Sequence, residues 1–136
     1  MIMNFEIENG TLEKYLGNEK EVVIPKSVEE IMAQAFFDAD TVESVIIDDD
    51  AECALHEYAF EHCHNLKQIY LGKGVTFSKL AEDVGTVFYR CDALERIDVS
   101  DENPYYSSEN GKLYNKDKTQ LLYDPADKYW LEDDEE

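Results

Sequence analysis

The sequence predicts a short α/β solenoid, because one unit of apolar positions occurs three times along the chain. An alanine or valine followed by phenylalanine opens each unit, and the phenylalanines are Phe36, Phe60 and Phe88. The units are spaced by 24 and 28 residues, which lies in the range of repeat lengths that build stacked coils. Each unit continues with one apolar residue and then an apolar pair: Val42 with Val45/Ile47, Leu66 with Ile69/Leu71, and Leu94 with Ile97/Val99.

Within each unit the apolar pair predicts a strand of about three residues. Alternation along the strand predicts that Val45 and Ile47 point inward and Ile46 outward. Segments 31–37 and 55–60 space their apolar residues near the helical period, which predicts a short helix or 3₁₀ turn in each. The third unit is longer because segment 73–85 carries an insertion, which we expect to form a surface loop.

Both ends of the repeat predict a capping hairpin. Asn9-Gly10 and Asn110-Gly111 are dipeptides that readily adopt the positive φ angles of a two-residue hairpin turn. A short strand at 22–24, ended by Pro25, follows the first hairpin and forms a partial repeat. The second hairpin continues through 112–114 to 120–123. We therefore expect a capped solenoid over residues 1–126 and an acidic C-terminal tail over residues 127–136.

The charge of the chain restricts its partners. The 136 residues include 32 acidic and 12 basic side chains, for a net charge of −20. Phosphate groups are bound by Lys and Arg, so this balance argues against direct binding to nucleic acid or to anionic membranes and favours a basic protein partner. No apolar run approaches the ~18 residues of a membrane span, so we expect no membrane insertion.

The cysteines and the first residues bear on the location of the protein. Cys53, Cys63 and Cys91 form no even-numbered disulfide framework. Cys63 and Cys91 share a column with Ala39, which predicts a small buried position with reduced thiols, although stacked coils would bring the two within disulfide range. Residues 1–10 lack the features of a secretory signal. These features predict a cytoplasmic protein, or a cell-surface or secreted one if a signal peptide has been removed.

No motif in the chain predicts catalysis, a metal or a cofactor. The spacing of Cys53, His56, His62 and His64 matches no common zinc pattern, and we expect both His62 and His64 to face solvent on either side of an inward Cys63. The acidic segment 48–52 lacks the residue order of a calcium-binding loop. We find no arrangement of nucleophile and base whose spacing points to an active site, so we expect no enzyme and no cofactor.

One surface is more apolar than solvation requires. The outward positions of the four strands form a stripe, and a second row lies beside it. The stripe consists of Val23, Ile46, Tyr70 and Asp98, and the flanking row consists of Glu21, Ser44, Gln68 and Arg96. Exposed apolar patches often mark interfaces, and tyrosine is favoured at binding hot spots. We expect a protein-binding site here, formed by the stripe together with Ser44, Gln68 and Arg96, although β-branched residues also simply suit strands.

Three segments resemble the BspA-type leucine-rich repeat family: VVIPKSVEEIMAQAF, AFEHCHNLKQIYLGKGV and NPYYSSENGKLYNKDKTQLLYDP. The opening NGTLEKYLG is similar to the lead-in of that family, and the resemblance covers residues 5–126. It implies a right-handed solenoid with a concave parallel sheet of short strands, and a role in protein binding, often adhesion, without catalysis. The chain departs from the family pattern at Asp48-Asp49-Asp50, which replace a proline turn, and at Val87, which replaces alanine.

Two functions follow as hypotheses. The first is a non-catalytic protein-binding module that uses the concave face of a small leucine-rich-repeat solenoid. The alternative is an acidic inhibitor or immunity-type protein that blocks a basic, nucleic-acid-handling partner, as the net charge of −20 suggests. The sequence leaves the oligomeric state and the identity of the partner open.

Overall fold

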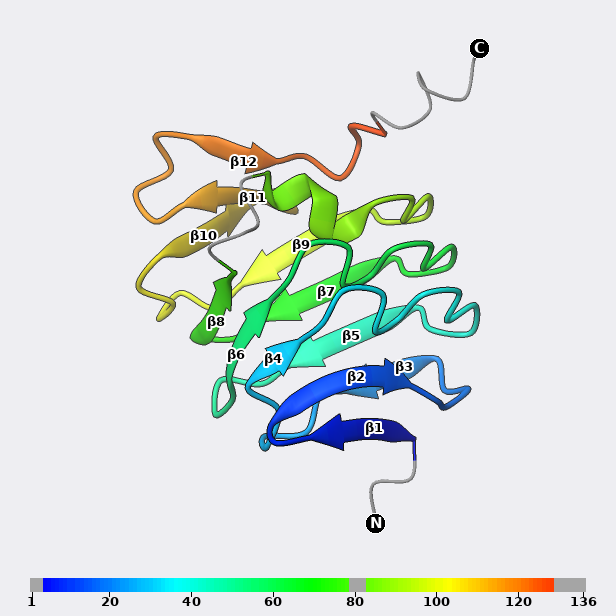
Figure 1. Cartoon of the computed structure of the whole chain (residues 1–136). Coiled ribbons are helices and arrows are strands. Elements are labelled where there is room, and N and C mark those ends of the chain that lie inside the picture. The colour runs from blue at the N-terminus through cyan, green and yellow to red at the C-terminus, as the bar shows by residue number, and fades with distance from the viewer. Residues whose placement is uncertain (1–3, 79–82, 129–136) are drawn as a thin grey trace.

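The computed structural model describes residues 4–78 and 83–128, and these residues form a short solenoid whose coils rise from the N-terminus toward the C-terminus (Figure 1). The strands belong to three sheets, with the orders β1-β2-β4-β6-β8, β3-β5-β7-β9 and β10-β11-β12. The solenoid prediction is confirmed. The α/β label is loose, because the described residues contain strands, turns and one 3₁₀ helix, η1 (Val84–Phe88), and no α-helix.

The predicted sheet of short parallel strands is present with the predicted register. It consists of β3 (Glu21–Val23), β5 (Ser44–Ile47), β7 (Gln68–Leu71) and β9 (Arg96–Val99). Val45 lies opposite Val22 and Ile69, and Ile69 lies opposite Ile97. Val45 and Ile47 are fully buried, whereas Ile46 is partly exposed, which confirms the predicted alternation.

A second sheet, which the sequence did not predict, forms just before the segments expected to be helical. It consists of the parallel strands β2 (Thr11–Tyr15), β4 (Glu30–Ile31), β6 (Glu52–Leu55) and β8 (Gly74–Phe77), with β1 (Phe5–Glu8) antiparallel to β2. Of the short helix or 3₁₀ turn expected at 31–37 and 55–60, the structure forms turns and no helix, with bonds such as those from the Ala35 N–H to the Met32 carbonyl at 3.1 Å and from the Ala59 N–H to the His56 carbonyl at 3.2 Å. Gln34 and Tyr58 have φ angles of 64° and 63°, which a right-handed helix cannot contain.

Backbone N–H groups in these turns bond both within their own coil and to the neighbouring coil. The Phe36 N–H donates to the Ala59 carbonyl at 3.1 Å, and the Phe60 N–H donates to the Val87 carbonyl at 3.0 Å. An α-helix would use the same N–H groups within its own segment. The coils are thus held together by hydrogen bonds that replace those of a helix.

A column of stacked aromatic rings runs through the core from one cap to the other. Its ring centroids are separated by 5.2 Å between Tyr15 and Phe36, 4.9 Å between Phe36 and Phe60, 6.1 Å between Phe60 and Phe88, and 5.8 Å between Phe88 and Tyr123. The three phenylalanines have no exposed surface. Buried aromatic pairs at these separations contribute packing beyond the area that they remove from water.

The shared column of Cys63 and Cys91 is buried, and all three cysteines are free thiols, as predicted. The Cys63 Sγ donates to the Phe36 carbonyl at 3.2 Å, and the Cys91 Sγ donates to the Phe60 carbonyl at 3.1 Å. Each thiol thereby links its coil to the coil before it. Burial raises the pKa of the Cys91 thiol from 9.0 to about 12.

Hairpins cap both ends of the solenoid, as predicted. Asn9 and Gly10 have φ angles of 52° and 81°, which a two-residue turn of this type requires. At the other end, β10 (Tyr106–Glu109), β11 (Lys112–Asn115) and β12 (Leu121–Tyr123) form an antiparallel sheet. The Ile97 N–H donates to the Gly111 carbonyl at 2.8 Å, so the C-terminal cap covers the edge of β9.

A buried asparagine attaches the C-terminal cap to the last coil. The Asn103 amide nitrogen donates to the carbonyls of Gly72 and Val75 at 3.0 Å each. Its carbonyl oxygen accepts from the backbone N–H groups of Tyr105 at 2.9 Å and Tyr106 at 3.0 Å. The side chain is fully buried with all these polar bonds made, as a buried amide requires.

Two predicted segments extend beyond the described residues. The insertion expected in 73–85 contributes β8, and its residues 79–82 lie outside the described ranges. The acidic tail expected from residue 127 likewise lies outside them after Lys128. Lys128 itself packs against the last coil, where its Nζ donates to the Leu94 carbonyl at 2.8 Å.

We expect Phe60→Ala to lower the free energy of unfolding by roughly 3 to 5 kcal/mol, since the ring is fully buried and stacked on both sides. Urea denaturation followed by circular dichroism measures the change. Tyr105→Ala is the matched control, because Tyr105 is 60% exposed and its loss should cost less than about 0.5 kcal/mol. A cost below about 1 kcal/mol for Phe60→Ala would show that Phe60 is not a core residue.

Stability should also depend on the Cys91 thiol at alkaline pH. The unfolded chain ionises this thiol near pH 9.0 and the folded chain only near pH 12, so the unfolded state binds fewer protons between these values. Stability is fully present below pH 9 and should fall by about 1.4 kcal/mol per pH unit for this thiol as the pH rises. The Cys91→Ala variant should show a shallower slope. Parallel slopes for both proteins would contradict this account.

Candidate protein-binding face

The outward side chains of β3, β5, β7 and β9 form the two rows that the sequence predicted. In the stripe, Val23 lies opposite Ile46, Ile46 opposite Tyr70, and Tyr70 opposite Asp98. The flanking row follows in the same register, with Glu21, Ser44, Gln68 and Arg96 opposite one another in turn. Parallel pairing places each residue directly beside its counterpart in the next coil. All seven residues predicted for the site therefore share one face.

The two rows enclose a shallow hollow of about 200 Å³ in the middle of this face. Side chains of the stripe and the flanking row that line it are Glu21, Ser44, Ile46, Gln68, Tyr70 and Asp98. Val23 is 51% exposed, while Ile46 and Tyr70 are partly buried. The apolar surface is thus concentrated toward the N-terminal coils.

Tyr70 is held in place by a turn at the end of the neighbouring strand. Its hydroxyl donates to Asp49 Oδ1 at 3.0 Å, and the same oxygen accepts from the Lys73 N–H at 3.1 Å. Partial burial raises the pKa of the Tyr70 hydroxyl, the Asp49 carboxylate adds to the rise, and a hydrogen bond with Ser100 opposes it. A tyrosine fixed in this way presents its ring with little loss of side-chain freedom on binding.

Charged groups at the C-terminal end of the face neutralise each other. Arg96 donates from Nε to Asp98 Oδ2 and from a terminal nitrogen to Asp98 Oδ1, both at 2.8 Å. This two-point bond to Asp98 raises the pKa of the Arg96 guanidinium. The face therefore changes from apolar at Val23 and Ile46 to a paired cation and anion at β9.

The sequence did not reveal the role of Asp49. The three carboxylates at 48–50 do not converge on one site, and each has its own partner. Asp50 pairs with Lys26 at 3.1 Å, and Asp48 Oδ1 accepts from the Asp49 N–H at 2.7 Å. In the sequence, the role of Asp49 was indicated only by the replacement of a proline turn at these positions. This replacement supplies a hydrogen-bond acceptor beside Tyr70.

The four residues whose spacing was compared with zinc patterns, Cys53, His56, His62 and His64, lie at two different sites in the structure. Cys53 is buried in β6, and His56 Nε2 lies 2.7 Å from Glu30 Oε1. His62 and His64 lie together, partly exposed, on either side of the inward Cys63, as predicted. The structure adds Asp38, from the preceding coil, to this pair.

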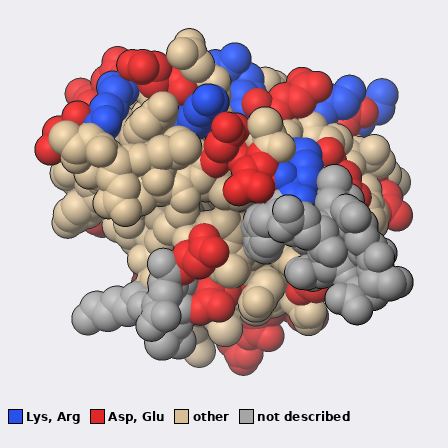
Figure 2. Space-filling view, turned by 90° about the horizontal axis from the view of Figure 1, so that it is seen from above, with Lys and Arg blue, Asp and Glu red and all other residues tan. Residues whose placement is uncertain are grey.

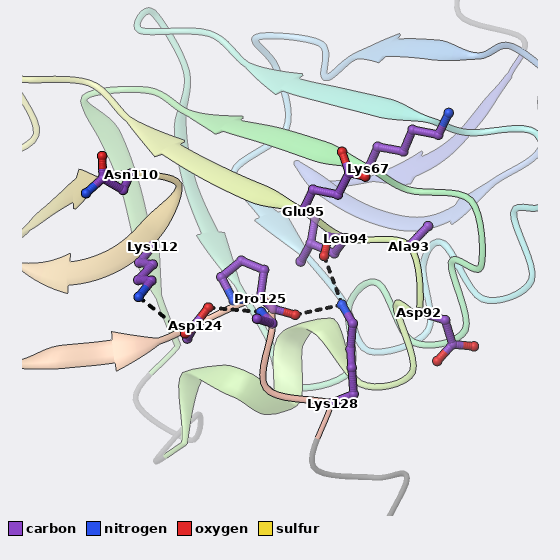
Figure 3. Close-up of a pocket in the computed structure, with 11 residues that line it drawn as sticks. Lys67, Asp92, Ala93, Leu94, Glu95, Asn110, Lys112, Asp124, Pro125 and Lys128 are labelled. Carbon is purple, nitrogen blue, oxygen red and sulfur yellow. Dashed lines mark hydrogen bonds and ion pairs between the residues drawn. The ribbon is translucent and has the colours of Figure 1, made fainter.

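Several further hollows lie away from the face. One of about 550 Å³ lies beneath the C-terminal cap, and Figure 3 shows Lys112, Lys128 and Asp124 among its lining residues. Lys112 Nζ lies 3.5 Å from Asp124 Oδ2, and Lys128 Nζ donates to the carbonyls of Leu94 and Pro125. These two cations already have partners in the cap and in the last coil, so we assign this hollow to the attachment of the cap.

Another hollow, of about 750 Å³, lies beside the N-terminal hairpin and is lined by Glu8, Glu13 and Glu30 together with His56 and Met32. Its lining thus groups three carboxyl side chains. None of the helices in residues 4–78 and 83–128 is long and apolar enough to cross a membrane.

Comparison with solved structures finds leucine-rich repeat proteins of bacteria. A leucine-rich repeat protein of T. pallidum aligns with a TM-score of 0.53 and 25% identity, over 64% of this chain and 40% of that protein. A leucine-rich repeat protein of Eubacterium ventriosum aligns at 19% identity and a TM-score of 0.39, over 85% of this chain and 44% of that one. A leucine rich cell surface protein of Faecalibacterium prausnitzii aligns at 16% identity and a TM-score of 0.38, over 84% and 57%. The chain therefore spans between 40% and 57% of the length of these three proteins.

Sequence comparison identifies the family. No curated protein matches the chain significantly. The model of the BspA type leucine rich repeat region matches residues 6–110 with six copies, and this span covers most of the chain. Together with the stacked coils and the T. pallidum likeness, this match shows that the chain belongs to the BspA-type leucine-rich repeat family.

Proposed function

We propose that the protein is a non-catalytic binding module that captures a protein partner on the outward face of the β3-β5-β7-β9 sheet. The observation that carries the proposal is the continuous register of Val23, Ile46 and Tyr70 across three coils, next to a hollow of about 200 Å³. Solenoids commonly bind proteins on such faces, since each coil adds side chains to one continuous surface.

The chemistry of the face indicates which kind of partner segment it suits. Val23 and Ile46 offer apolar contact, Tyr70 offers a fixed ring, and Glu21, Ser44 and Gln68 offer hydrogen-bonding groups around the hollow. Arg96 and Asp98 are already paired with each other, so a partner need not neutralise them. We propose that a partner inserts an apolar or aromatic side chain beside Tyr70 and bonds to the flanking row.

The acidic inhibitor function remains a second proposal, and the hollow lined by Glu8, Glu13 and Glu30 favours it. The net charge of −20 would attract a basic partner over a distance. Figure 2 shows acidic side chains on the face seen from above, interspersed with Lys and Arg and with uncharged surface. The described part of that face thus supports general attraction more than a single acidic site.

We propose a cytoplasmic location on the basis of the three buried free thiols, which suit a reducing compartment. A cell-surface or secreted location is the alternative. Fractionation of the native cells separates the two, and recovery of the protein in the surface fraction would contradict the proposal.

The main proposal is tested by titrating a partner, captured from a native lysate, against Tyr70→Ala. A hot-spot tyrosine should cost at least about 2 kcal/mol of binding, which is roughly a 30-fold rise in Kd. Folding should lose only about 1 kcal/mol, the value of one hydrogen bond such as that to Asp49. Tyr105→Ala is the control, because it removes an exposed ring from the C-terminal cap. An unchanged Kd for Tyr70→Ala, with a loss at Tyr105, would place the interface on the cap.

The second proposal makes a different prediction for the same complex. A charge-dominated interface should weaken steeply as salt is raised, because dissolved ions largely screen exposed charges that are farther apart than the Debye length, which is about 10 Å at 0.1 M. Replacing Glu8 and Glu13 by glutamine should then reduce both the affinity and its dependence on salt. An affinity that is the same at low and high salt would eliminate the inhibitor function.

A further inference from the structure

Three metal-binding side chains converge on a ridge of the solenoid away from the β3-β5-β7-β9 face. His62 Nδ1 lies 3.3 Å from His64 Nε2, and Asp38 Oδ1 lies 3.7 Å from His62 Nδ1 and 3.9 Å from His64 Nε2. Their side chains are 30%, 42% and 55% exposed for His62, His64 and Asp38 respectively. The cluster is thus accessible to an ion from solution.

The separations of these donor atoms suit a metal ion. Three atoms with these separations lie on a circle of radius about 2.1 Å, so an ion at its centre is at an ordinary zinc–nitrogen or zinc–oxygen distance from each. The planes of the two imidazole rings are inclined by 83° to each other, and their centroids are 5.0 Å apart. The two rings are nearly perpendicular and do not stack, but their nitrogens lie close together. An ion can therefore lie between these nitrogens.

The repeat explains why these residues meet. Asp38 and His62 are 24 residues apart and occupy one column of the solenoid, with φ angles of 57° and 61° in successive tight turns. His64 lies two residues further on. Between the histidines, the Cys63 N–H donates to the Phe60 carbonyl at 3.2 Å and the Cys63 Sγ donates to the Phe36 carbonyl at 3.2 Å. This buried anchor fixes the short His-Cys-His segment.

Neighbouring groups also position the two imidazoles. The Phe37 ring packs against His62, with centroids 5.2 Å apart. On the other side, His64 Nδ1 lies 3.5 Å from Asp92 Oδ2, which comes from the third coil. A carboxylate on the far nitrogen of a ligating histidine fixes its tautomer and orientation, and this arrangement is common at metal sites.

We propose that Asp38, His62 and His64 bind one divalent transition-metal ion of the zinc class, with Asp92 as a positioning residue. Two imidazole nitrogens and one carboxylate oxygen suit zinc and its neighbours, whereas calcium and magnesium prefer sets of oxygen ligands. The exposure of all three ligands leaves the remaining coordination positions to water. The ion would join the first coil, through Asp38, to the second, and this site does not depend on the proposed binding face.

The site is tested by equilibrium dialysis of the full chain against ZnCl2 with a large excess of MgCl2, which occupies sites of general acidic attraction. Wild type should bind one Zn²⁺ per chain. His62→Asn and His64→Asn should each raise the Kd at least about tenfold, and Asp92→Asn should raise it about 10- to 100-fold. Asparagine is chosen because it tolerates the positive φ of residue 62.

His56→Asn serves as the matched control. It removes a histidine that is paired with a carboxylate at 2.7 Å but has no second histidine beside it among the described residues. This variant should bind Zn²⁺ as wild type does. Co²⁺ should show visible absorption bands with wild type that are absent with His62→Asn/His64→Asn.

Three results would overturn the proposal. The first is a wild-type chain that binds no Zn²⁺ in excess Mg²⁺, and the second is a double variant whose Kd stays within about twofold of wild type. The third is an equal loss in His56→Asn, which would show that the histidines act only through general attraction.

Discussion

The structure depends on one column of stacked rings, Tyr15, Phe36, Phe60, Phe88 and Tyr123, which passes through every coil and enters both caps. A single coil of this size cannot bury its apolar side alone, so each coil is stable only against its neighbours. The rings must therefore recur at one position of each turn. That requirement sets the period of the chain, and the period in turn aligns every other column.

The remaining contacts between coils follow from this alignment. The thiols of Cys63 and Cys91 donate to the carbonyl of the phenylalanine one coil earlier, and the backbone of each turn bonds to the next. At the C-terminal end, the cap bonds to polar groups of the last coil. Asn103 makes four hydrogen bonds at the base of the C-terminal cap, and the Ser108 hydroxyl accepts from the Val99 N–H at 2.8 Å on the edge of β9.

The sequence predicted the columns well and the local conformation less well. The alternation of Val45 and Ile47 identified the first sheet, because a strand with one buried face leaves a period of two. The second sheet was missed because β4 is only two residues long and Ile31, Ala35 and Phe36 have helical spacing. Those strands are stabilised by the neighbouring coils, which a local pattern does not record. The Asp38–His62 contact was missed for a related reason: the two residues are 24 positions apart, so no local pattern brings them together.

The same stacking gives the protein a face of outward side chains at Val23, Ile46 and Tyr70 and a ridge that holds His62 and His64, so both proposals require that the coils and caps form one cooperative unit. Native-state hydrogen exchange of the amides in β2, β7 and β11 tests this requirement most directly. If the ring column couples the caps to the coils, the slowest amides of all three strands should exchange only through global unfolding, with the same free energy of opening. Slowest amides in β2 or β11 that open at a free energy lower by about 2 kcal/mol or more than those in β7 would contradict the account.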